Sequence, residues 1–152
     1  MKIDILRMSI PNEAIQHVYN THAYKIFRDY KSWDEAKEEC ERLGGHLITI
    51  TSEEEQRYIE TYIRELVGET EPRKIWIGCT DEGHEGDWRW CTGEPFEYNN
   101  WGTRQPDDLN GQNHAIIQNY VIIRYNIEQF GWDDIDQNDE NNIWYICEWD
   151  YI

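Results

Sequence analysis

Residues 32–68 read SWDEAKEECERLGGHLITITSEEEQRYIETYIRELVG and contain two helix-like segments with matching start and stop signals. The first opens with the capping box Ser32-Trp33-Asp34-Glu35 and stops at Gly44-Gly45. The second opens with a similar box, Ser52-Glu53-Glu54-Glu55, and stops at the glycine that closes the stretch. Because apolar residues recur on one face of each segment, we predict two amphipathic helices joined by a short strand or extended connector at His46–Ile50.

The chain on either side of this stretch favours β-strands. Apolar and polar residues alternate, or β-branched and aromatic residues cluster, in six segments: 17–19, 23–27, 75–80, 88–91, 114–125 and 143–149. Phe130-Gly131-Trp132 is interpreted as a turn between the last two. Two helices followed by antiparallel strands predict an α+β fold, because a doubly wound sheet would alternate helices and strands.

The length of 152 residues suits one domain, which we place at residues 13–152 after a lead-in or linker at 1–12. The net charge of −17 argues against binding nucleic acid or an anionic membrane surface, since both attract clustered Lys and Arg. No apolar run approaches the roughly 20 residues of a membrane span. The five histidines show no metal or catalytic-triad spacing and no nucleophile–base motif occurs, so the chain is not expected to be an enzyme.

Four cysteines allow three pairings. Cys79 and Cys91 bracket a predicted hairpin and should lie close together, which leaves Cys40 to pair with Cys147. The alternative is four buried thiols in a reducing compartment.

A long polar loop covers residues 99–113, where side-chain oxygens outnumber apolar groups. Gln105 and Asp107 flank Pro106 in this loop, and a second acidic group, Asp133-Asp134, follows Trp132. Hard oxygen ligands without a nearby cluster of Cys or His suit Ca²⁺. The two segments therefore form a candidate calcium site, provided that the fold brings them together.

Several spaced motifs resemble those of the C-type lectin-like domain family, in the family's order and from about Val18 to Glu148. They are Cys40, Gly45-His46-Leu47, Trp76-Ile77-Gly78, Asn100-Trp101, Gln105-Pro106-Asp107 and Tyr145-Ile146-Cys147-Glu148. The resemblance implies an α+β domain with two helices, antiparallel sheets, paired terminal strands and a long ligand-binding loop. It also supports a Cys40–Cys147 bridge, leaves Cys79–Cys91 as a bridge particular to this chain, and implies an extracellular or cell-surface location.

Family calcium ligands can be carried over by position. The resemblance implies that Ca²⁺ is held by five side chains: Gln105, Asp107, Gln112, Asp133 and Asp134. Gln112 stands where the family has Glu, and Asp133 stands where it has Asn, so the number of carboxylates is conserved at three. The hairpin loop after residue 80 resembles the family's auxiliary calcium loop, which implies a second site formed by Asp81, Glu85, Asp108 and Asn113.

Carbohydrate is the ligand that the resemblance implies. In the family, two vicinal sugar hydroxyls complete the calcium shell, and Gln-Pro-Asp favours galactose-type sugars. The sugar would contact Gln105, Asp107, Gln112 and Asp133, and several copies of the domain in an oligomer would raise avidity. The alternative hypothesis is a lectin-like domain that binds a protein or another non-sugar ligand without calcium.

Overall fold

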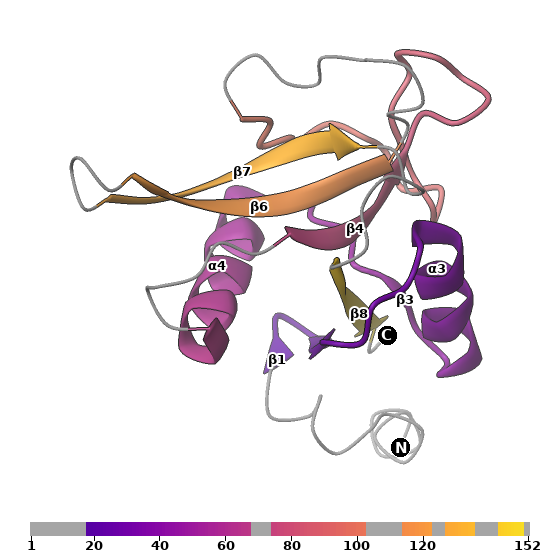
Figure 1. Cartoon of the computed structure of the whole chain (residues 1–152). Coiled ribbons are helices and arrows are strands. Elements are labelled where there is room, and N and C mark those ends of the chain that lie inside the picture. Colours follow the sequence, from indigo (N-terminus) through magenta and orange to yellow (C-terminus); the bar gives the residue numbers. More distant parts are fainter. Residues whose placement is uncertain (1–17, 68–73, 103–113, 123–126, 136–142, 151–152) are drawn as a thin grey trace.

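The computed structural model describes residues 18–67, 74–102, 114–122, 127–135 and 143–150. They form a mixed sheet with one helix packed on each face (Figure 1). The elements follow the predicted α+β order, and their bounds are β1 Val18–Tyr19, β2 His22–Phe27, α3 Trp33–Arg42, β3 His46–Leu47, α4 Glu53–Val67, β4 Lys74–Thr80, β5 Arg89–Trp90, β6 His114–Ile122, β7 Ile127–Ile135 and β8 Trp144–Asp150.

Helix α3 begins as the sequence predicts. The Ser32 hydroxyl accepts the backbone N–H of Glu35 at 3.2 Å, and the Glu35 carboxylate accepts the Ser32 N–H at 3.0 Å. Gly44, with φ of +85°, follows the C-cap residue Leu43 and ends the helix. The capping box and the glycine stop are therefore both confirmed.

Helix α4 has only half of its predicted capping box. The Ser52 hydroxyl accepts the Glu55 N–H at 3.1 Å, as expected. The Glu55 carboxylate does not return to Ser52; it accepts the Thr51 N–H at 2.9 Å and the Tyr24 hydroxyl at 2.5 Å. Glu55 is buried, so this third residue of the box joins α4 to strand β2.

The main sheet has the strand order β1-β2-β8-β4-β6-β7, with β3 beside β8 and β5 beside β4. Every described pair is antiparallel except β4–β8, which is parallel, so the sheet is mixed. The terminal strands β2 and β8 pair over their length, as the resemblance implied. Asn20 and Thr21 both have positive φ, which is the backbone of a two-residue hairpin turn between β1 and β2.

The predicted turn at Phe130-Gly131-Trp132 is wrong. These residues lie inside β7 and pair with Asn119, Gln118 and Ile117 of β6 in one long hairpin. Gly131 interrupted the apolar pattern and suggested a turn, but here it permits a close backbone approach to Gly102.

Alternation along the strands builds two cores on opposite faces of the sheet. Tyr24, Ile75 and Ile77 pack with Ile59 and Ile63 of α4 on one face. The intervening residues pack with α3 on the other face, in a core that includes Ala23, Trp33, Ala36, Trp76 and Tyr145. Within the described part of the chain, no helix is long and apolar enough to cross a membrane.

All four cysteines are free thiols in the structure, so neither predicted disulfide is formed in it. Cys40 and Cys147 both lie in the α3-side core, and this pairing stays a prediction. The reasoning for Cys79–Cys91 needs correction. Cys79 faces the α4-side core, whereas the Cys91 sulfur lies over Gly78, 2.9 Å from where a Cβ would be, on the α3 side. The hairpin brings the two backbones together but points the side chains to opposite faces.

Candidate ligand-binding loop and its acidic strand

Both ends of the long polar loop are fixed to strand β7. At its start, the Trp132 N–H donates to the Asn100 carbonyl and the Gly102 N–H donates to the Trp132 carbonyl, each at 2.9 Å. After the loop, His114 pairs with Ile135 at the first position of β6. The residues between these two anchors on β7 are Asp133 and Asp134, so residues 103–113 leave and rejoin the sheet beside the predicted acidic pair.

Trp132 supports the start of the long loop through its side-chain contacts in the α4-side core. Its side chain is fully buried, and its indole N–H donates to the Gln56 amide oxygen of α4 at 2.9 Å. Rings of Trp90, Tyr98 and Trp101 pack edge-on against it at centroid distances of 5.6–6.0 Å. Trp132 is therefore a core residue that supports the loop, and not a stacking platform for a ligand.

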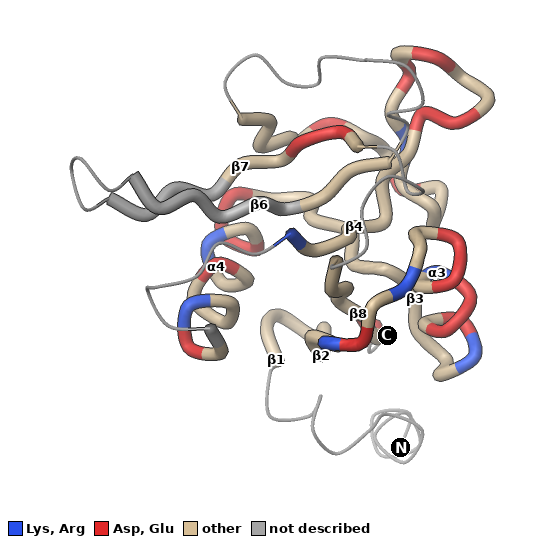
Figure 2. The backbone as a smooth tube through the Cα atoms, viewed as in Figure 1, with Lys and Arg blue, Asp and Glu red and all other residues tan. Residues whose placement is uncertain are grey.

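The acidic pair differs in burial. Asp134 is fully buried, while Asp133 is partly exposed. In Figure 2 the acidic residues of β7 and those of the loop after β4 are coloured red at the same end of the sheet. Carboxylates that are withdrawn from bulk water beside a loop rich in oxygen atoms suit a hard divalent cation.

Asp81 begins the loop after β4, next to Thr80, which pairs with His114. One of its carboxylate oxygens accepts the Gly86 N–H at 2.9 Å. The other oxygen, Oδ1, is buried and has no hydrogen-bond partner among the described residues. Because a buried carboxylate oxygen without a partner is costly, this atom fits a role as a cation ligand at the predicted second site. Glu85 lies in the same loop and is exposed.

Five predicted ligands lie outside the described residues: Gln105, Asp107, Asp108, Gln112 and Asn113. The structure thus gives positions to Asp81, Glu85, Asp133 and Asp134, and it brings Asp133 and Asp134 beside both loop ends.

One polar cluster was missed by the sequence analysis. His22, His46, Glu148 and Asp150 come together from three neighbouring strands, although 128 residues separate the first from the last. A search for local spacing cannot detect such a cluster. The sequence contained one local signal for this cluster. Glu148 and Asp150 are two positions apart, so in a strand their side chains project from the same face.

The described residues thus form a two-helix α+β domain in which a long polar loop is anchored beside an acidic pair on β7. The profile of the Lectin C-type domain matches residues 29–149, so the chain belongs to the C-type lectin domain family, which is a carbohydrate-binding family in general.

The chain is similar to mouse C-type lectin domain family 4 member F, with 42% identity over 101 residues that cover 62% of this chain and 17% of that protein. It therefore spans about one sixth of that relative. Perlucin-like protein of Mytilus galloprovincialis is 31% identical over 130 residues, which cover 85% of this chain and 77% of that protein.

Among solved structures, the mouse scavenger receptor C-type lectin carbohydrate-recognition domain is 32% identical, with a TM-score of 0.68 over 89% of this chain and 93% of that one. A calcium-independent type II antifreeze protein is 26% identical, with a TM-score of 0.67 over 89% and 91% of the two chains. Domains of this fold therefore include a carbohydrate-recognition domain and a protein that does not use calcium.

Proposed function

We propose that this chain is a calcium-dependent carbohydrate-binding domain that favours galactose-type sugars. The observation that carries the proposal is the double anchoring of the long loop on β7, on either side of Asp133 and Asp134. Both described ends of the loop therefore lie next to this acidic pair in the sheet.

The proposed primary site consists of Asp133 and Asp134 together with Gln105, Asp107 and Gln112 from the loop. Three carboxylates and two amide oxygens supply five of the six to eight oxygens that Ca²⁺ takes, and sugar hydroxyls or water would complete the set. When bound, the ion would offer coordination positions to two vicinal hydroxyls. The side chains of Gln105, Asp107, Gln112 and Asp133 would accept from or donate to those hydroxyls and so determine which stereochemistry fits.

We propose a second, auxiliary calcium site at Asp81 and Glu85, with Asp108 and Asn113 from the loop. Its support is the buried Oδ1 atom of Asp81, which lacks a partner among the described residues. An extracellular or cell-surface location and assembly into an oligomer for avidity complete the proposal.

The first experiment is calorimetric titration of Ca²⁺ into chelator-treated protein. Asp134→Asn keeps the shape of the side chain but removes its charge, and it should weaken calcium binding at least tenfold. Asp29→Asn, at an exposed aspartate, is the matched control and should bind as the original chain does. Absence of heat and of any calcium-dependent shift in melting temperature would refute the proposal. A ligand captured equally well with chelator would instead favour a calcium-independent, protein-binding domain.

Sugar preference needs a separate test, because calcium binding can survive when the preference is wrong. A glycan array probed with and without chelator should show calcium-dependent signal on galactose-terminated glycans. The paired replacement Gln105→Glu with Asp107→Asn gives Glu-Pro-Asn, the sequence that favours mannose-type sugars in the family, and it should move the signal to mannose. Stronger binding of the original chain to mannose would overturn the galactose assignment while leaving the calcium site intact.

A further inference from the structure

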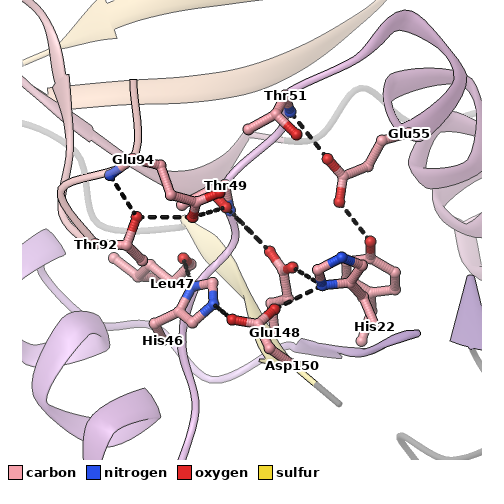
Figure 3. Close-up of polar contacts among 11 residues, drawn as sticks. His22, His46, Leu47, Thr49, Thr51, Glu55, Thr92, Glu94, Glu148 and Asp150 are labelled. Carbon is pink, nitrogen blue, oxygen red and sulfur yellow. Dashed lines mark hydrogen bonds and ion pairs between the residues drawn. The ribbon is translucent and has the colours of Figure 1, made fainter. Parts of the chain in front are cut away.

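Three ligand-type side chains converge at the end of the sheet formed by β2 and β8 (Figure 3). The His22 Nδ1 atom lies 2.6 Å from Asp150 Oδ1 and 2.7 Å from Glu148 Oε2. His22 and Asp150 are paired across the two strands, and Glu148 is two positions earlier on the same face of β8. The two backbones therefore fix the positions from which all three side chains project.

Glu148 is an unusual member of this cluster because its side chain is only 2% exposed. Its Oε1 atom accepts the Thr49 N–H at 3.0 Å, which leaves Oε2 directed at His22. A carboxylate so deeply buried requires a charged or strongly polar partner. Asp150 and His22, which are 45% and 33% exposed, leave the other side of the cluster open to solvent.

His46, on β3, holds the cluster from the opposite side of β8. Its Nε2 atom lies 2.9 Å from Asp150 Oδ2, and its Nδ1 atom lies 2.7 Å from the Leu47 carbonyl. Both contacts restrict the imidazole ring, and the first orients the Asp150 carboxylate so that Oδ1 faces His22. His46 therefore acts as a positioning residue for Asp150.

We propose that His22, Glu148 and Asp150 form a binding site for a divalent cation of the zinc type, separate from the long loop. One imidazole nitrogen and two carboxylate oxygens, one of them on the buried Glu148, are the borderline donor set that Zn²⁺ accepts and Ca²⁺ does not prefer. The net charge of the two carboxylates balances that of the ion.

The geometry requires only a small adjustment. Ligand atoms about 2.0–2.2 Å from a tetrahedral Zn²⁺ are about 3.3 Å apart, so the His22 contacts of 2.6 and 2.7 Å would have to lengthen by a fraction of an ångström. In the metal-free protein, His22 Nδ1 is within hydrogen-bonding distance of both carboxylates, and a cation would take the place of the shared hydrogen on binding. Three protein ligands leave one position for water or for a group from another molecule.

A second cluster competes for the same assignment. Asp34, Glu82 and His114 also place ligand atoms near one another, with His114 Nε2 3.2 Å from Glu82 Oε2. Asp34 and Glu82 are exposed on separate elements, whereas Glu148 and Asp150 share one strand with a buried member. The observations therefore favour the His22 cluster, and the experiment includes the other as an outcome.

The test is titration of ZnCl₂ into metal-stripped protein, in buffer containing saturating calcium so that any calcium sites are filled. We expect saturable binding to one site and a rise in melting temperature. His22→Gln and Asp150→Asn should each weaken zinc binding at least tenfold, and His46→Gln should weaken it roughly tenfold through loss of orientation. His84→Gln, at an exposed histidine, is the matched control and should leave zinc binding unchanged.

Both His22→Gln and Asp150→Asn are measured, so that a loss of zinc binding is not mistaken for misfolding of one variant. His22 and Asp150 are both partly exposed, so at least one replacement should retain the fold, judged by its circular dichroism spectrum and a cooperative melt. Zinc binding that is absent from the original chain, or equal in every variant, would overturn the proposal. Binding that survives His22→Gln but is lost in Glu82→Gln would place the ion at His114 and overturn it as well. None of these outcomes depends on calcium or sugar binding.

Discussion

Gly131 and Gly102 are in backbone contact: a Cβ atom placed on Gly131 would lie 3.0 Å from the Cα of Gly102 and 3.3 Å from its nitrogen. That nitrogen donates to the Trp132 carbonyl, so the start of the long loop rests directly on β7. A side chain at residue 131 would separate the two segments. Because residue 131 is a glycine, the start of the loop at Gly102 can lie directly against β7, close to the acidic pair.

Gly131→Ala should destabilise the protein by about 1–3 kcal/mol and weaken calcium binding several-fold, because the loop must shift to admit the methyl group. Gly131 does not have the positive φ of Gly44, Gly83, Gly86 and Gly93, so backbone strain would not explain the loss. Urea denaturation and calcium calorimetry on the same preparation measure both effects. Unchanged values for stability and affinity would show that the contact does not constrain the loop.

The Gln56–Trp132 hydrogen bond gives a second prediction. Gln56→Leu removes the acceptor at 2.9 Å and leaves a buried indole N–H without a partner, which should cost about 1–3 kcal/mol. For a domain of this size that corresponds to a fall in melting temperature of roughly 2–10 °C. Gln56→Glu retains an acceptor oxygen and is the control; it should lose less stability than the Leu variant. Equal losses would mean that packing, not the hydrogen bond, fixes Trp132.

Three consecutive glutamates open α4, and only the third is buried. Glu55→Ala removes the acceptor for both Thr51 N–H and the Tyr24 hydroxyl, so the free energy of unfolding should fall by about 2–3 kcal/mol. The matched variant Glu54→Ala, at an exposed position, should change it by less than about 0.5 kcal/mol. Chemical denaturation of the pair measures the difference, and similar losses for the two would contradict the structural role of Glu55.

The sequence predicts the two helices and most strands because their signals are local. Capping boxes, glycine stops and alternating apolar residues act within a few positions of one another. The parallel β4–β8 pairing and the continuous β7 strand depend on contacts between distant segments, so local patterns do not reveal them. Gly131 shows the difficulty: a glycine in a strand and a glycine in a turn look alike until the neighbouring Gly102 is known.

The same distinction between local signals and distant contacts applies to the residues of the candidate site. Motif resemblance selected Asp133 and Asp134 as calcium ligands because the motif spans consecutive positions; the structure places both beside the loop ends, and their role as ligands stays a prediction. It could not detect the polar cluster of His22, His46, Glu148 and Asp150, whose members come from three strands. Nor could the spacing of Cys79 and Cys91 show that alternation along β4 and β5 turns their side chains to opposite faces.

The stability of metal-free protein should fall as the pH rises from about 6 to 8.5. Hydrogen bonds to Asp150 and Glu148 raise the pKa of His22 from 6.5 to about 10, and burial raises the pKa of Glu148 from 4.5 to about 7. Both folded pKa values exceed the unfolded ones. The associated stability is therefore complete below the unfolded pKa and is lost as the pH rises through the folded one.

Because His22 is partly exposed, its share of the loss is about 1 kcal/mol, or roughly 2–4 °C in melting temperature. Urea denaturation in the presence of chelator measures it, with His22→Gln as the comparison. The variant should lose less stability than the original chain over this range. A parallel pH dependence in the two proteins would contradict the assignment of the effect to His22.

Mild oxidation should join Cys40 to Cys147 and leave Cys79 as a thiol. Cys40 and Cys147 lie in the same core, and closing a loop of about a hundred residues should stabilise the protein by up to roughly 4–5 kcal/mol. Cys79 is buried in the core on the other face of the sheet, where no second cysteine of the described residues packs.

Peptide mapping without reduction, after alkylation of the folded protein, identifies the bonded pair. The expected result is a Cys40–Cys147 peptide, with Cys79 alkylated only after denaturation. Cys40→Ala should abolish the gain in stability on oxidation, whereas Cys79→Ala should leave that gain intact. Recovery of a Cys79–Cys91 peptide as the main product would refute the opposite-face arrangement, because that bond requires β5 to rotate its side chains relative to β4.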